Sequence, residues 1–266
     1  MPDMPKIVVN FDKRANPEVD FRSVYCCPVN YCDLLVERGV LVLPSLPVSF
    51  HKSLMLNLVD MADGFLFIGG ADYPAEEFGL EPDEADMPMD PRRVRNDVEL
   101  FKAAWASSKP ILGICAGLQL AVLVHGGKLV RNLPAGGMHR PVSRTKDSMH
   151  AVRITSGKLR AILGGESAVV NSAHHQGVRP EDVPADKIQV AALAPDGVVE
   201  ALERKSKGFG LFVQWHPERH PSIEHRKKIF DSFVKAVEYS FQRRSNHGRT
   251  ARPSGGTEGR YNRFGL

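Results

Sequence analysis

Short apolar runs alternate with amphipathic stretches along most of the chain. The apolar runs predict buried strands, and stretches with apolar side chains three or four positions apart predict helices between them. The expected strands cover residues 6–10, 40–44, 64–70, 110–114, 150–154, 168–172, 188–193, 198–203 and 210–215. The expected helices cover residues 30–38, 51–61, 91–107, 118–124, 159–163 and 223–241. This alternation predicts an α/β fold with a parallel sheet covered by helices on both faces.

Several polar segments interrupt this pattern. Residues 11–27 and 134–148 are polar and irregular, and Pro195-Asp196-Gly197 predicts a hairpin turn. Residues 71–90 carry eight acidic side chains, which fits either a solvated loop or a lid beside a binding site. We expect one domain over residues 1–242, followed by a basic, disordered tail over residues 243–266, because the tail has almost nothing to bury.

The charge of the chain is concentrated in that tail. The net charge is +4, but residues 243–266 hold six arginines against one glutamate, so the remaining residues sum to −1. A nucleic-acid partner is therefore not expected, since it would need a basic face on the folded part. With no run long enough to span a membrane and no recognisable secretory signal, we expect a cytoplasmic protein and no membrane partner.

The four cysteines form neither a disulfide framework nor a zinc-binding pattern, because none of them makes a C-x-x-C pair. Cys115 stands apart, between a predicted strand and a predicted helix in Gly113-Ile114-Cys115-Ala116-Gly117. A strand–turn–helix elbow of this kind presents a nucleophile, and the helix N-terminus favours a thiolate. The alternative is that Cys115 is simply a small core residue.

Two further predicted strand ends carry groups that complement a thiol. His216 and Glu218 follow the strand at 210–215, where the imidazole can act as a base and the carboxylate can orient it. Gly69 and Gly70 follow the strand at 64–70, and their free backbone N–H groups, with that of Ala116, can face an oxyanion. Reactive groups gather at the carboxyl ends of parallel strands, which favours catalysis over a set of capped strand ends.

The remaining histidines do not indicate a metal site. His216, His220 and His225 cannot share one helical face, because Pro217 and Pro221 lie among them. No metal and no cofactor is therefore expected. The pair His174 and His175 fits either a substrate pocket or a capped strand end, and the spacing alone leaves both alternatives open.

Several segments together resemble a known family. Residues 113–119 and 213–218 resemble the two hallmarks of class I glutamine amidotransferase-like proteins. Residues 69–72, 170–176 and 196–201 resemble segments of the γ-glutamyl hydrolase branch (peptidase C26 type), which includes the γ-glutamyl-γ-aminobutyrate hydrolases. The resemblance covers roughly residues 6–240. It departs from that branch at Ala116 and Asn96, where arginine is common.

The resemblance implies a flavodoxin-like, open, mostly parallel sheet and a Cys–His–Glu triad. Carried over by position, Cys115 is the nucleophile, His216 the base and Glu218 its orienting group. Gly70 and Ala116 supply the oxyanion N–H groups. The substrate-binding residues implied in the same way are Gly69, Gln119, Ser172, His174, His175 and Gln176.

The leading hypothesis is a cysteine hydrolase that cleaves a γ-glutamyl amide of a small molecule through a thioester on Cys115, with water as acceptor. One alternative is a glutaminase subunit that delivers ammonia to a separate synthase partner. Another is an inactive binding or regulatory protein, against which the intact Cys115, His216 and Glu218 argue. The sequence leaves a homodimer open.

Overall fold

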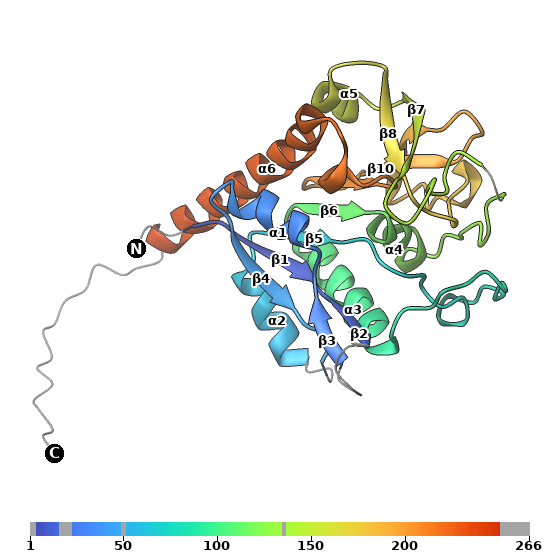
Figure 1. Cartoon of the computed structure of the whole chain (residues 1–266). Helices are drawn as coiled ribbons and strands as arrows, with labels where there is room; N and C mark the ends of the chain where they lie inside the picture. Colours follow the sequence, from blue (N-terminus) through green and yellow to red (C-terminus); the bar gives the residue numbers. More distant parts are fainter. Residues whose placement is uncertain (1–3, 16–22, 49–51, 135–136, 251–266) are drawn as a thin grey trace, which may run out of the picture.

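A nine-stranded sheet runs through the molecule, with helices on both of its faces (Figure 1). The computed structural model describes residues 4–15, 23–48, 52–134 and 137–250. The strands are β1 Lys6–Asn10, β2 Asp12–Ala15, β3 Ser23–Cys26, β4 Leu41–Ser45, β5 Gly64–Phe67, β6 Ile111–Ile114, β7 Ser148–Ile154, β8 Ser167–Ser172, β9 Ile188–Leu193, β10 Val199–Arg204 and β11 Gly210–Val213. The helices are α1 Val29–Val36, α2 Lys52–Met61, α3 Pro91–Ser107, α4 Ala116–Val124, α5 Gly157–Leu163 and α6 Ile223–Thr250.

The sheet has a parallel half and an antiparallel half. Its strand order is β4-β1-β5-β6-β11-β10-β9-β7-β8. The pairs from β4 to β11 are parallel, and those from β11 to β8 are antiparallel. Strands β9 and β10 are the two arms of the hairpin expected around Gly197. The parallel half brings the carboxyl ends of β5, β6 and β11 to one edge, where the expected chemistry lies.

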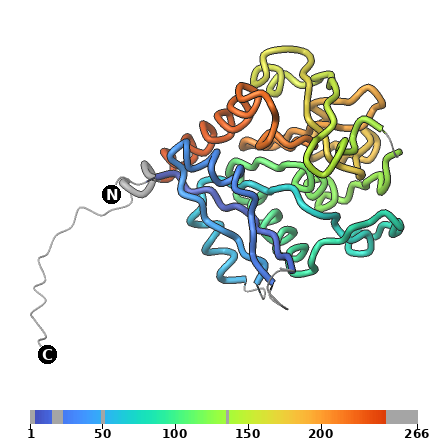
Figure 2. Tube along the Cα trace, viewed as in Figure 1, coloured from blue at the N-terminus to red at the C-terminus, as the bar shows by residue number. Residues whose placement is uncertain are grey.

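Each face of the sheet has its own hydrophobic core. One core joins α1, α5 and α6 to the sheet, and Tyr31, Leu159 and Phe233 belong to it. The other joins α2, α3 and α4, and Met55, Phe101 and Leu120 belong to it. The backbone trace shows the same two helical layers (Figure 2). The expected flavodoxin-like α/β fold, an open sheet covered by helices on both faces, is confirmed, and its parallel pairing covers the half from β4 to β11.

Two elements differ from the sequence-based expectation. The polar stretch 11–27 contains the β2–β3 pair, which is held by polar contacts rather than by an apolar stripe: Nζ of Lys13 lies 2.6 Å from Oδ2 of Asp90. Helix α6 continues to Thr250, so residues 243–250 are helical and not a disordered tail. Arg244 contributes to this extension, because its Nε lies 2.9 Å from Oδ1 of the buried Asp63. Residues 251–266 lie outside the described part of the chain.

None of the helices in the described ranges combines the length and the apolar character that a membrane crossing requires.

Candidate active site

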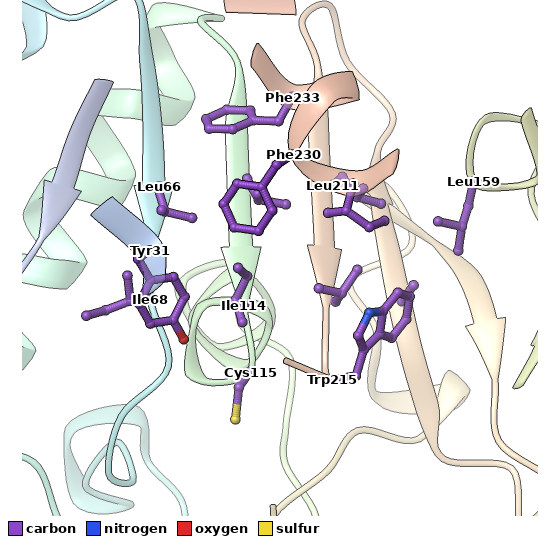
Figure 3. Close-up of a cluster of buried hydrophobic side chains, with 14 of the residues drawn as sticks. Tyr31, Leu66, Ile68, Ile114, Cys115, Leu159, Leu211, Trp215, Phe230 and Phe233 are labelled. Carbon is purple, nitrogen blue, oxygen red and sulfur yellow. The ribbon is translucent and has the colours of Figure 1, made fainter. Parts of the chain in front are cut away.

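Cys115 occupies a strained turn between β6 and α4. Its φ of 53° and ψ of −103° lie in a region that residues with a side chain rarely adopt. The turn is held from both sides: the N–H of Cys115 donates to Val213 O at 2.8 Å, and its carbonyl accepts from the N–H of Leu118 at 2.9 Å. The side chain therefore projects from the end of the strand at the start of a helix, which is the expected elbow (Figure 3).

Close packing explains the glycines around this turn. A Cβ on Gly117 would lie 2.5 Å from Phe67 O, and one on Gly113 would lie 2.8 Å from Gly117 O. Both contacts involve backbone atoms, so neither can be relieved by moving a side chain. The sequence thus places glycine where α4 must approach β5 and β6 closely.

His216 and Glu218 follow β11 at the same edge of the sheet. Nδ1 of His216 lies 2.8 Å from Oε1 of Glu218, and both side chains are buried. Burial by itself lowers the pKa of His216, but the charge of Glu218 and the neighbouring Cys115 raise it to about 10. The imidazole is therefore protonated at neutral pH, with Glu218 on one of its sides and Cys115 nearby.

The loop after β5 lies between these groups. A Cβ on Gly69 would lie 2.9 Å from Cε1 of His216 and 3.5 Å from Cβ of Cys115. The N–H of Gly69 donates to the hydroxyl of Tyr31 at 3.3 Å. Burial, together with the charges of Glu218 and Cys115, raises the pKa of Tyr31 well above its ordinary value, so its hydroxyl keeps its proton. Tyr31 lies beside Cys115 in Figure 3. The ends of β5, β6 and β11 thus converge as expected.

The N–H groups of Gly70 and Ala116 are unused by the hydrogen bonds of the described residues. Ala116 opens α4, so its N–H points out of the helix start. The loop that carries Gly70 rests on the fully buried Arg93, whose Nη2 donates to Gly69 O at 3.2 Å and to Ile68 O at 3.4 Å. These two N–H groups are available to an oxyanion, and a cation fixes the loop that presents one of them.

Arg93 is itself anchored by two carboxylates. Its Nη1 lies 3.1 Å from Oδ1 of Asp12, and its Nε lies 3.2 Å from Oδ2 of Asp97. The hydroxyl of Tyr73 donates to the same Oδ2 at 2.9 Å. Sequence reasoning missed Arg93, because a charged residue in the first turn of a helix is typical of an exposed surface.

The acidic segment 71–90 contacts the segment after β8. Nε2 of His175 lies 2.9 Å from Oδ2 of Asp72, and Nε2 of Gln176 donates to Oδ1 of Asp86 at 3.0 Å. Arg131 pairs with the same Asp86 at 2.7 Å. These contacts hold the acidic segment against the segment after β8, so it is not a freely solvated loop.

The other expected substrate-binding side chains, those of Gln119, Ser172 and His174, make hydrogen bonds or close polar contacts within the protein. Nε2 of Gln119 donates to Gln176 O at 3.5 Å, which links α4 to the segment after β8. Oγ of Ser172 donates to His139 O at 3.0 Å. Nδ1 of His174 faces Gln176 O at 2.8 Å, and its Nε2 faces Glu200 at 3.6 Å. Substrate contacts by the side chains of Ser172 and His174 stay predictions that these internal contacts do not support.

Gln214 is a further residue at the centre that the sequence-based set lacked. Its Nε2 donates to Sγ of Cys115 at 3.5 Å, and the side chain is fully buried. Its position immediately before Trp215 and His216 could have indicated such a role, because alternate residues at the end of a strand share a face.

The molecule also has an apolar cavity of about 420 Å³ away from these residues, near the end of β4 and the starts of α2 and α3. Its lining includes Leu46, Leu54, Met55 and Leu58, together with Arg92 and Arg95. The residues described there include no thiol, imidazole or carboxylate. The candidate chemistry therefore belongs to the strand ends around Cys115.

Comparisons with known proteins agree with this geometry. A sequence model of the family described as Peptidase C26 matches residues 7–218. YvdE of Lactococcus lactis, named a glutamine amidotransferase-like protein, is 34% identical over 213 residues, which are 78% of this chain and 87% of that protein. The γ-glutamyl-γ-aminobutyrate hydrolase PuuD of Escherichia coli K12 is 32% identical over 221 residues, which are 79% of this chain and 85% of PuuD.

The fold recurs in a solved structure with little sequence identity. The glutaminase domain of Trypanosoma brucei CTPS, solved with bound acivicin, aligns with a TM-score of 0.61 at 17% identity. The alignment covers 88% of this chain and 94% of that one. This likeness establishes that the two chains share a fold.

Proposed function

The chain belongs to the Peptidase C26 family of glutamine amidotransferase-like hydrolases, and from this premise we propose that it cleaves γ-glutamyl amides of small molecules through a thioester on Cys115. The observation that carries the proposal is the convergence of Cys115, the His216–Glu218 pair and two unused N–H groups at one edge of the sheet. The relative PuuD supports the γ-glutamyl part, since its name gives a γ-glutamyl amide as its substrate.

In the first half of the reaction, the Cys115 thiolate attacks the carbonyl carbon of the γ-amide. The N–H groups of Gly70 and Ala116 stabilise the oxyanion that forms. The raised pKa of His216, about 10, supports its role as the acid that protonates the leaving nitrogen. The C–N bond breaks, the amine departs with that proton, and a γ-glutamyl thioester stays on Cys115.

In the second half, His216 is neutral and acts as a base. It takes a proton from water, whose oxygen attacks the thioester carbonyl carbon at the same oxyanion position. The C–S bond breaks, and the products are glutamate, the Cys115 thiolate and a protonated His216. Glu218 orients the imidazole in both halves, which the 2.8 Å hydrogen bond supports.

Recognition of the γ-glutamyl group is proposed for the residues around the acidic segment. The amino and carboxylate groups of a γ-glutamyl moiety carry opposite charges, so a site for it needs both acceptors and donors. The neighbouring His175–Asp72 and Gln176–Asp86 pairs offer both. Gln119 completes the proposed pocket. The N–H and carbonyl of Gly69 are used by Tyr31 and Arg93, so a substrate contact by Gly69 stays a prediction.

A panel of γ-glutamyl amides tests this proposal. Purified protein is given glutamine, γ-glutamyl-γ-aminobutyrate and γ-glutamyl amides of other amines, and released glutamate is measured. We expect turnover by the chain alone, abolished in Cys115→Ala and kept in the matched control Cys32→Ser. Ammonia release from glutamine that requires an added protein would instead select the glutaminase-subunit alternative. No turnover of any amide would leave the binding-protein alternative.

A further inference from the structure

Three histidines converge on one buried carboxylate in the antiparallel half of the sheet. We call this set the Glu200 cluster: Glu200, His139, His150 and His174. Oε1 of Glu200 lies 3.1 Å from Nδ1 of His139, 3.4 Å from Nε2 of His150 and 3.6 Å from Nε2 of His174. Every member is more than nine-tenths buried, and Glu200 is fully buried. The members come from β7, β10, the segment before β7 and the segment after β8.

The inward atoms of the cluster contact one another, and among the described residues they make no hydrogen bond outside the cluster. This holds for the three inward imidazole nitrogens and for both carboxylate oxygens of Glu200. Buried polar atoms without partners are costly, so a buried group of them calls for a binding partner. These five atoms, which are three imidazole nitrogens and the two oxygens of one carboxylate, lie together and are of the kinds that bind metal ions.

The outward nitrogens determine which form the rings take. Nδ1 of His150 faces Ala151 O at 3.2 Å, and Nδ1 of His174 faces Gln176 O at 2.8 Å. Nε2 of His139 faces Oδ2 of Asp196 at 3.1 Å. Because carbonyl and carboxylate oxygens only accept, each outward nitrogen carries the hydrogen, and in a neutral ring the inward nitrogen carries a lone pair. Metal-binding histidines are oriented in this same way.

We propose that the Glu200 cluster binds a divalent transition metal ion, zinc in the first instance. Imidazole nitrogens with one carboxylate suit zinc, and alkaline-earth ions prefer oxygen ligands. Ligand atoms about 2.0–2.1 Å from a tetrahedral zinc ion lie about 3.3 Å from one another. The ligand atoms of His139, His150 and Glu200 all lie within 4.8 Å of one another, so these three residues form the ligand set after a small inward adjustment. Nε2 of His174 lies beside this set, 3.6 Å from Oε1 of Glu200.

The charges of the site balance with such an ion. Three neutral imidazoles and the Glu200 carboxylate leave one positive charge on a bound divalent ion. The Asp196 carboxylate, in contact with His139, neutralises that charge in the outer shell. Without a cation, three lone pairs would face a carboxylate, which is unfavourable unless the rings take up protons.

Such an ion would join the segment before β7, which holds His139, to the segment after β8, which holds His174. The segment after β8 also contacts the acidic segment 71–90. The backbone already joins the segments of His139 and His174 in part, because the N–H of His174 donates to His139 O at 2.9 Å. The bound ion therefore has a structural role next to His175 and Gln176. The proposal replaces the sequence-based expectation that the chain holds no metal, and it is independent of the chemistry at Cys115.

Metal analysis of the untagged full chain tests the proposal. Protein produced with zinc in the medium is dialysed, and its metal content is measured by mass spectrometry. We expect about one zinc ion per chain, and a higher Tm for the zinc form than for chelator-treated protein. Cobalt added to the chelator-treated protein should give the visible absorption of a tetrahedral cobalt site. Less than about a tenth of an ion per chain, with no uptake of zinc or cobalt, overturns the proposal.

Variants locate the site. Glu200→Gln, which keeps the size of the side chain, and His150→Ala should lose stoichiometric zinc and the cobalt spectrum. Asp196→Asn changes only the outer shell and should weaken zinc binding by about 10–100-fold. The matched control is His225→Gln, because His225 is a buried histidine with an unpaired Nε2 outside the cluster. Unchanged zinc binding in both Glu200→Gln and His150→Ala, or its loss in His225→Gln, contradicts the assignment.

Discussion

Replacing Glu218 by glutamine removes a charge from the active site and leaves the size of the side chain unchanged. The carboxylate oxygen is 2.8 Å from Nδ1 of His216, and both groups are buried, so solvent screens their interaction little. Burial lowers the pKa of His216, whereas Glu218 and Cys115 raise it to about 10. Glu218→Gln removes the carboxylate charge that raises the pKa of His216, so this pKa should fall toward its ordinary value or below it.

The size of the effect depends on pH. At about pH 8 a ring with a pKa of about 10 is almost entirely protonated, whereas a ring with a pKa of about 6.5 is protonated in roughly 3% of molecules. The leaving nitrogen takes its proton from this ring, so kcat should follow the protonated fraction of His216. This loss of protonated ring alone should lower kcat roughly 30-fold at about pH 8 and less than about twofold at about pH 6. Poorer orientation of the ring adds a loss at all pH values, giving a total of about tenfold to a thousandfold.

The assay is the pH dependence of kcat and KM on the best γ-glutamyl amide. We expect the loss to fall mainly on kcat, to grow with pH and to remain smaller than that of His216→Ala. Glu224→Gln is a suitable control, because this exposed glutamate lies on α6 and, among the described residues, pairs with Lys228 alone. If Glu218→Gln keeps the kcat of the wild type across the pH range while His216→Ala is inactive, then another group orients His216 and the proposed triad is wrong.

Three further changes test separate parts of the site and fold. Cys115→Ala should lower kcat by several orders of magnitude and keep the circular dichroism spectrum; more than about a tenth of wild-type activity would exclude it as the nucleophile. Arg93→Lys should lower kcat by about 10–100-fold with little change in KM, because one ammonium cannot bond the Gly69 loop and two carboxylates together; equal losses at Met55→Leu would point to general destabilisation. Deleting residues 251–266 should leave kcat and Tm unchanged, whereas deleting from residue 243 should lower Tm through loss of Arg244.

The parallel half of the sheet was predictable because its strands are apolar runs with sharp boundaries. In that half Lys6–Asn10 coincides with an expected strand, and elsewhere Ile188–Leu193 coincides with an expected strand and Pro91–Ser107 with an expected helix. The β2–β3 pair was not predictable in this way. Asp12 is buried because it pairs with Arg93, a residue distant in the sequence, and no local pattern reports such a contact. The end of α6 depends in the same way on the distant Asp63.

The site residues also differ in whether the local sequence could predict them. Cys115 lies directly after β6, and His216 and Glu218 lie in the short segment that follows β11, so the topology brings all three to one edge of the sheet. Arg93 and Tyr31 contact the site through residues that are distant in the sequence. From the local sequence alone, Arg93 would be predicted to be an exposed surface arginine and Tyr31 an ordinary aromatic core residue. The Glu200 cluster was equally hidden, because its histidines are spread from residue 139 to 174 and carry none of the short spacings of common zinc motifs.

The central claim is that Cys115 carries a γ-glutamyl group during turnover. Protein mixed with a γ-glutamyl amide is quenched in acid within the first turnovers, digested and analysed by mass spectrometry. The account predicts a γ-glutamyl adduct on the peptide that contains Cys115, removed by hydroxylamine as the γ-glutamyl hydroxamate and missing in Cys115→Ala. Rapid hydrolysis with no adduct on Cys115 at any quench time, or with an adduct on another residue, would contradict it.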